Sequence, residues 1–173
     1  EQSSLLAATY LEERQQYVVL EEFDSFQNWL TDVRSPQARS DSLASGILFD
    51  VEHNHLWPSN WGAKPSTTSV RERRVKALVA SAPRLIRIYG SRYLLAEPCL
   101  AGNPIFSIDQ SDVVVYAASL REYLLFEFAE LLGLARPEIE RTTRATIRAR
   151  QAQYAKVPFW GTLATSWRAY VAA

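Results

Sequence analysis

The hydrophobic pattern of this chain changes period at Leu85, and this change constrains the fold more than any other feature. From Leu85 to Tyr89 apolar and polar side chains alternate with a period of about 2, which is typical of a strand with two different faces. The turn residues at 90–91 then predict a hairpin, and two more strands are expected at 105–108 and 113–117. Short neighbouring strands of this kind predict a mostly antiparallel sheet.

Helical periodicity precedes and follows the predicted strands. Ser119 and Glu122 match a capping box, Gly133 suits a left-handed helix end, and Pro137 suits the first turn of a helix. The predicted helices cover residues 5–10, 24–33, 67–82, 119–132 and 137 onward. This order predicts an α+β fold, with a central mostly antiparallel sheet flanked by N- and C-terminal helices.

The size of the chain fits one domain. Its 173 residues and 47% hydrophobic content are typical of a single compact unit over 1–173, of which 1–45 would be an N-terminal helical part. Within that part, the polar stretch 34–45 is interpreted as a loop that leads to a short buried strand at 47–49.

Two apolar segments have no clear period. Trp57 and Trp61 lie in a loop-like segment, and we expect both rings to pack inward because large aromatic side chains are costly to leave in water. The closing segment 157–160 should dock on the body of the domain. Both segments are therefore expected to contribute to the core.

The chain carries 19 basic and 19 acidic side chains, and its formal net charge is zero. This balance hides opposed blocks: residues 1–50 hold nine acidic and three basic side chains, residues 51–100 hold three and eight, and residues 101–173 hold seven and eight. Zero net charge disfavours a nucleic-acid or anionic-membrane binder, and the basic side chains of 71–92 are interpreted as a solvated face. The opposed blocks predict a polarised surface, whose acidic part is the first place to expect a protein partner.

We expect neither a membrane segment nor an export signal. The longest apolar run, 113–118, is far shorter than the roughly 18 residues of a bilayer-spanning helix. The first residues lack the basic and apolar regions of a secretory signal. Cys99 is the only cysteine, which rules out an internal disulfide framework and favours a reducing compartment. The expected location is cytoplasmic.

Chemistry-bearing side chains are few. His53 and His55 lie near two carboxylates, but two ligands leave a zinc site incomplete, so we interpret them as a solvated pair. Asp109 and Asp112 lie between two predicted strands and are interpreted as turn formers. Cys99 is interpreted as a small buried apolar residue. We therefore expect no metal, no cofactor and no enzyme activity; a hydrolase or nucleic-acid enzyme is disfavoured.

Two segments, 84–95 and 102–116, resemble the signature of the SUKH superfamily. Residues 57–62 and 157–160 are similar to the Trp-rich loop and the C-terminal Pro-Phe-Trp element of that family. The resemblance is carried by Trp57, Trp61, Gly62, Tyr89, Gly90, Gly102, Asn103, Pro104, Ser107, Gln110, Asp112, Tyr116, Pro158, Phe159 and Trp160. The chain departs from the family pattern where Arg87, Ser91 and Leu95 replace Pro, His and Pro, and where Ser111 replaces Thr.

The resemblance implies a scaffold that works by binding a protein. Bacterial members of the superfamily are associated with immunity to polymorphic toxins, which they neutralise by occupying or distorting the active site. The expected partner is a cognate protein toxin, of which a basic nuclease is one kind, with no nucleic acid bound directly. The candidate partner surface is acidic and consists of Glu12, Glu13, Glu21, Glu22, Asp24 and Asp32. The alternative is a regulatory scaffold or ligand-binding module of the same fold without a toxin partner.

Overall fold

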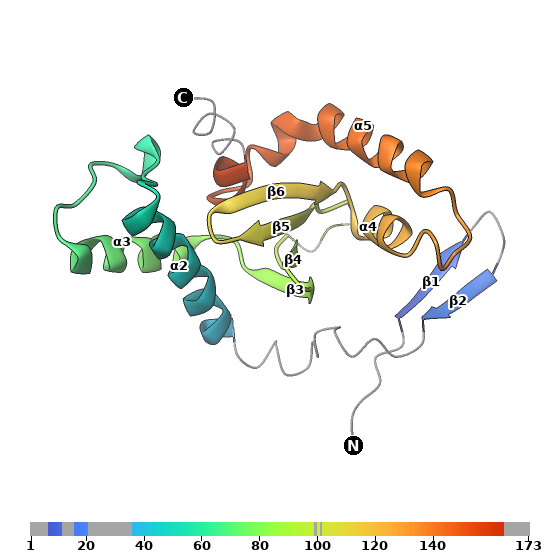
Figure 1. The fold of residues 1–173 in the computed structure, drawn as a ribbon, viewed down its shortest axis with the longest axis horizontal. Coiled ribbons are helices and arrows are strands. Elements are labelled where there is room, and N and C mark those ends of the chain that lie inside the picture. The colour runs from blue at the N-terminus through green and yellow to red at the C-terminus, as the bar shows by residue number, and fades with distance from the viewer. Residues whose placement is uncertain (1–6, 12–15, 21–35, 99, 101, 165–173) are drawn as a thin grey trace, which may run out of the picture.

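The computed structural model of the chain has an α+β fold (Figure 1) and describes residues 7–11, 16–20, 36–98, 100 and 102–164. Its main sheet is antiparallel, with four strands in the order β3-β4-β5-β6. These strands are β3 (Leu85–Tyr89), β4 (Arg92–Leu95), β5 (Ile105–Asp109) and β6 (Asp112–Ala117). The helices are α2 (Pro36–His53), α3 (Thr68–Ser81), α4 (Leu120–Glu127) and α5 (Arg136–Tyr154). None of the helices in the described part of the chain is long and apolar enough to cross a membrane.

The predicted strands and their hairpins are confirmed. In the first hairpin Ile86 pairs with Leu94, and Gly90 turns the chain with a φ of 50°. Such a positive φ favours glycine because glycine lacks a Cβ atom. In the second hairpin Asp109 pairs with Asp112 across a two-residue turn.

The prediction for residues 34–49 is wrong, because α2 replaces the predicted loop and strand. Ala44, Ile47 and Val51 are buried, whereas Phe49 is 47% exposed. The buried positions are three and four residues apart, which is the spacing of one face of a helix. The three adjacent apolar residues at 47–49 therefore do not form a buried strand. Pro36 occupies the first position of this helix, where a missing backbone N–H costs no hydrogen bond.

The predicted helix at 5–10 is also wrong in its described part. Strand β1 (Ala7–Leu11) pairs antiparallel with β2 (Gln16–Leu20), so that Thr9 lies opposite Val18. The β-branched and aromatic residues of both segments favour this pairing over a helix. The helix predicted at 24–33 lies outside the described residues.

The helices on either side of the sheet agree more closely with prediction. Helix α3 ends shortly before Pro83, and Pro137 lies in the first turn of α5. The Ser119 hydroxyl accepts a hydrogen bond from the Glu122 backbone N–H at 3.2 Å, as the capping box requires. Helix α4 ends at 127, earlier than predicted, and a series of turns leads to Gly133 with its φ of 64°.

The sheet has two apolar sides with different covers. The larger core joins one side of the sheet to α2, α3 and the C-terminal segment, and includes Ile47, Val51, Val75, Val79, Leu95, Phe106, Ile108, Val113, Trp160 and Leu163. The smaller core lies against α4 and consists of Ile88, Ile105, Ala117 and Tyr123. Helix α5 runs alongside β6 (Figure 1), with residue contacts to both β6 and α4.

A buried carboxylate connects α2 to the β5–β6 turn. Asp50 is 3% exposed, and its Oδ2 accepts hydrogen bonds from the Ser111 backbone N–H at 2.9 Å and from the Ser111 hydroxyl at 2.5 Å. Its Oδ1 accepts a third hydrogen bond from Asn54 at 2.6 Å. Since a buried carboxylate without such donors is strongly unfavourable, these bonds hold the helix and the turn in one relative position.

We predict that Asp50→Ala destabilises the fold by about 2–4 kcal/mol, because it leaves the buried Ser111 N–H and hydroxyl without an acceptor. Urea unfolding followed by circular dichroism measures this change. The matched control is Asp109→Ala, an exposed carboxylate in the same turn region, for which we expect a change within about 0.5 kcal/mol. Equal unfolding midpoints for the two variants would contradict the role given to Asp50.

Candidate functional site

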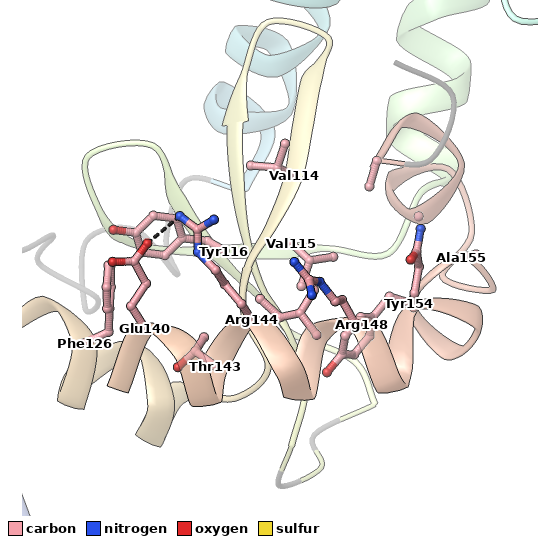
Figure 2. A pocket seen from close by; sticks show the side chains of 14 residues that line it. Val114, Val115, Tyr116, Phe126, Glu140, Thr143, Arg144, Arg148, Tyr154 and Ala155 are labelled. Atoms are coloured by element: carbon pink, nitrogen blue, oxygen red, sulfur yellow. Dashed lines mark hydrogen bonds and ion pairs between the residues drawn. The ribbon is translucent and has the colours of Figure 1, made fainter. Parts of the chain in front are cut away.

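A groove of about 380 Å³ lies between β6 and α5 (Figure 2). The β6 side consists of Val114, Val115 and Tyr116, and Phe126 of α4 contributes at one end. The α5 side and the segment after it contribute Glu140, Thr143, Arg144, Ile147, Arg148, Gln151, Tyr154, Ala155, Gly161 and Ala164. The groove therefore combines segments that are distant in the sequence.

The spacing along α5 explains which of its side chains line the groove. The lining positions recur every three or four residues, which places them on one face of a helix. Thr143 and Tyr154 on this face are buried and anchor the helix, while Arg144 and Arg148 remain exposed at the rim. Figure 2 shows the two arginine side chains directed from α5 toward β6.

The sequence places Arg141, Arg144 and Arg148 on one solvated stripe, and all three are exposed. Arg144 and Arg148 line the groove, whereas Arg141 is not among the lining residues. The spacing alone could not separate them, because the groove is defined by β6 as well as by the helix.

A bulge in the sheet shapes the β6 side of the groove. Ile105 pairs with Ala117, but the next residue, Phe106, pairs with Val115, so Tyr116 is an additional residue on β6. A β-bulge changes the direction in which the following side chains point. Val115 and Tyr116, which would otherwise face opposite sides of the sheet, can therefore both line the groove.

The ring of Tyr116 is held by several contacts. Its hydroxyl donates a hydrogen bond to Glu127 Oε2 at 2.9 Å, and the Arg92 guanidinium carbon lies 3.9 Å from the ring centroid. The Phe126 ring packs edge to face with it at 5.7 Å. Burial raises the pKa of Tyr116, and the Glu127 carboxylate raises it further, while Arg92 opposes both effects. Tyr116 is therefore a neutral and well-packed end wall of the groove.

The charges that line the groove are unequal. Two guanidinium groups and one carboxylate line it, which gives a local net charge of +1. Glu140 forms an ion pair with Arg144 one helical turn away. Arg148 has no ion-pair or hydrogen-bond partner among the residues that the structure describes. A cation is thus available at the rim for a ligand.

The tryptophans and Phe159 of the SUKH-like segments pack in or against the larger core, whereas Tyr89 and Tyr116 pack against the smaller one. Trp61 and Trp160 are buried, Trp61 stacks on Phe159 at 5.8 Å, and Trp57 meets Trp61 edge to face at 5.4 Å. The indole N–H of Trp160 donates to the Pro83 carbonyl at 2.8 Å. The inward packing expected for Trp61 and the closing segment is confirmed, and Trp57 is partly buried against the same core.

Most other residues of the resemblance shape turns. Gly102 has a φ of 88°, and the Asn103 side chain donates to the Pro98 carbonyl at 2.5 Å. Gln110 has a φ of 55° in the β5–β6 turn, where Asp112 is exposed. Ser107 is different, since its hydroxyl accepts a hydrogen bond from Arg92 Nη1 at 2.7 Å. These positions determine backbone geometry rather than provide a reactive group.

Both histidines of the predicted pair are exposed, one at the end of α2 and one in the loop after it. His53 is the last residue of α2, and its ring stacks on Phe49 at 4.3 Å, while His55 follows in the loop. Nearby Glu52 forms an ion pair with Arg71 at 2.6 Å, and this hydrogen bond lowers the pKa of Glu52. Within the described ranges, no three His, Cys, Asp or Glu side chains gather closely enough to hold a metal ion.

The acidic partner surface is untested, because all six of its residues, Glu12, Glu13, Glu21, Glu22, Asp24 and Asp32, lie outside the described residues. Cys99 also lies outside them. The groove between β6 and α5 was not predicted from the sequence. The spacing of Arg144 and Arg148 marks one face of α5, but it does not reveal a groove that also needs β6.

Comparisons with known proteins leave the family open. No known protein family, no curated protein and no solved structure matches the chain. The SUKH resemblance therefore rests on the sequence segments that carry it, and it remains a prediction.

We predict that Tyr123→Phe leaves stability unchanged or raises it by up to about 1 kcal/mol, because the buried hydroxyl of Tyr123 has no hydrogen-bond partner among the described residues. Burial raises the pKa of Tyr123. Above a pH of about 10 the unfolded chain releases this proton while the folded chain keeps it, so stability falls as the pH rises. The phenylalanine variant should lose less stability between pH 9 and about 11.

Thermal unfolding at several pH values measures both effects. The matched variant is Tyr116→Phe, which loses the hydrogen bond to Glu127 and should be destabilised by about 1 kcal/mol at neutral pH. If Tyr123→Phe cost as much as Tyr116→Phe, the unpartnered state of the Tyr123 hydroxyl would be refuted.

Proposed function

We propose that this chain is an immunity-type protein that binds a cognate bacterial toxin in the cytoplasm and neutralises it through protein–protein interaction. The observation that carries the proposal is that structural residues and the candidate binding surface lie largely in different segments of the chain. Most residues of the SUKH-like segments pack the core or shape turns, and only the end of one segment, at Val114, Val115 and Tyr116, reaches the groove. Arg148, the groove cation without a partner among the described residues, lies on α5, outside those segments. A scaffold that keeps its core and turns can vary such a surface to fit one partner.

Neutralisation by binding needs only a sufficient interface. A stable complex buries about 800 Å² on each partner. The groove could provide the centre of such an interface, because apolar and aromatic side chains surrounded by charges are typical of binding hot spots. The bound immunity protein would block or distort the active site of the toxin.

The acidic N-terminal residues have a separate role in this proposal. A carboxylate cluster complements a basic nuclease and accelerates the encounter by electrostatic attraction, most strongly at low salt. We propose Glu12, Glu13, Glu21, Glu22, Asp24 and Asp32 for this role, with no nucleic acid or membrane bound directly.

The structural role of the buried Asp50 carboxylate also supports a binding function rather than catalysis. The two hydrogen bonds from Ser111 to Asp50 hold α2 and the β5–β6 turn together, and the Asn54 side chain, which follows α2 directly, occupies the other carboxylate oxygen. A general base must be able to reach a substrate, and Asp50 is engaged with the fold.

A second candidate is a regulatory or ligand-binding module of the same fold. The observation that favours it is the groove volume of about 380 Å³, within the range of small-molecule sites. The gene next to this one separates the two candidates. A toxin gene supports the immunity function, and its absence across occurrences supports the module.

The proposal predicts that the chain captures the protein encoded by the adjacent gene and protects cells that express it. Replacing Glu21 and Glu22 by lysine should slow association by roughly tenfold at low salt, because it reverses the attracting charge. Biolayer interferometry measures the rate, and growth during toxin expression measures protection.

The matched control is Glu130→Lys, an exposed carboxylate outside the acidic cluster. It should leave the association rate within about twofold. If the wild-type chain neither captured nor protected against the adjacent product, the immunity function would be wrong. If the lysine variant associated as fast as the wild type, only the surface assignment would be wrong.

A further inference from the structure

We infer that the groove between β6 and α5 receives an extended, acidic segment of the protein partner. The inference rests on the proposed function and deepens it, since it names the surface and the chemistry of the segment that binds there. Three features of the groove carry it: an edge strand, an available cation and an apolar floor.

The edge strand favours an extended occupant. In the described part of the chain β6 is the last strand of the main sheet, with β5 on its inner side only. Its outer edge has no strand partner there, and such edges bind extended peptides through main-chain hydrogen bonds. Helix α5 lies beside this edge but leaves the groove between them.

The charges favour an acidic occupant. Arg148 has no partner in the described residues, and Arg144 is neutralised by one carboxylate, Glu140, which lies on its own helix. Both guanidinium groups are directed toward β6 (Figure 2). A carboxylate of an incoming segment can accept two parallel hydrogen bonds from a guanidinium group, which gives Arg148 a specific ligand.

The apolar side of the groove sets the pattern of the segment. Val114 is 42% exposed, and Val115 and Ile147 also line the groove. In an extended segment successive side chains point to opposite sides, so one side can meet the valines while the other meets the arginines. The occupant should therefore alternate apolar and acidic residues.

Segments of this chain are weaker candidates for the occupant. Residues 165–173 follow Ala164 at the groove but contain Arg168 and no carboxylate side chain. In the proposed function, the acidic residues of the first 35 positions bind a basic surface of the partner instead. An occupant from the partner is therefore the choice that the charges support.

The first experiment uses the full chain and two synthetic peptides. One alternates valine and glutamate over seven residues, and the other alternates valine and lysine. In nuclear magnetic resonance titrations we expect saturable shifts at the amides of β6 and around Arg148 with the glutamate peptide only. Arg148→Glu should weaken this binding by roughly tenfold or more, because it turns an attraction into a repulsion.

The matched control is Arg141→Glu on the same helix. Arg141 is exposed like Arg148 but does not line the groove, so its replacement should leave peptide affinity within about twofold. Circular dichroism confirms that both variants fold. Equal binding of the two peptides, shifts elsewhere on the protein, or no binding of the glutamate peptide would overturn the inference.

Two further measurements separate the inference from the proposed function and from an internal occupant. If the wild type captures the adjacent gene product and Arg148→Glu captures it equally well, the groove assignment is wrong and the immunity function stands. If the wild type captures nothing, the immunity function fails, and the peptide titration decides the groove by itself. If replacing Glu21 and Glu22 by lysine shifts the groove amides of the free protein, the chain fills its own groove, and the inference is wrong.

Discussion

The carboxylate of Asp50 is the contact on which the arrangement of the molecule depends. It is buried, and it accepts hydrogen bonds from both polar groups of Ser111, which lies 61 residues further along the chain. The two segments also approach closely, since a Cβ atom on Gly46 would lie 3.2 Å from the Cα of Gln110. Gly46 thus permits the contact, and Asp50 stabilises it. The β5–β6 turn is fixed against α2. Because β6 begins at this turn and lines the groove, the contact also fixes the position of one groove wall.

This constraint explains how one sheet serves two purposes. One side of the sheet is covered by the larger core, whose aromatic members Trp61, Phe159 and Trp160 close it. The outer edge of β6 faces α5, and the additional residue Tyr116 forms part of the groove wall beside that helix. The packed core on one side of the sheet allows an open groove at the β6 edge, because the groove walls do not depend on a ligand to hold them.

Local patterns in the sequence predicted the strands well, and non-local contacts explain the failures. The alternation after Leu85 and the turn at Gly90 predicted both the first hairpin and its position. Helix α2 was missed because Asp50 interrupts its apolar face, and the residue that satisfies this carboxylate lies on another element. Only the spacing of Ala44, Ile47 and Val51 could have revealed the helix. The groove could not be predicted, because it needs the bulge in β6 and the docking of α5, neither of which has a local signal.

In the proposed complex, the distribution of charge determines how the partner is oriented. The acidic residues concentrate in the first 50 positions, whereas the groove carries a net positive charge on a chain whose total charge is zero. A neutral but polarised protein exerts little attraction at a distance beyond roughly 10 Å in physiological salt, yet it orients a partner of opposite polarity at close range. A toxin with a basic surface and an acidic segment would therefore meet both regions only in one orientation. Specificity would then follow from geometry, because a partner with one of the two charges alone is attracted at one end and repelled at the other.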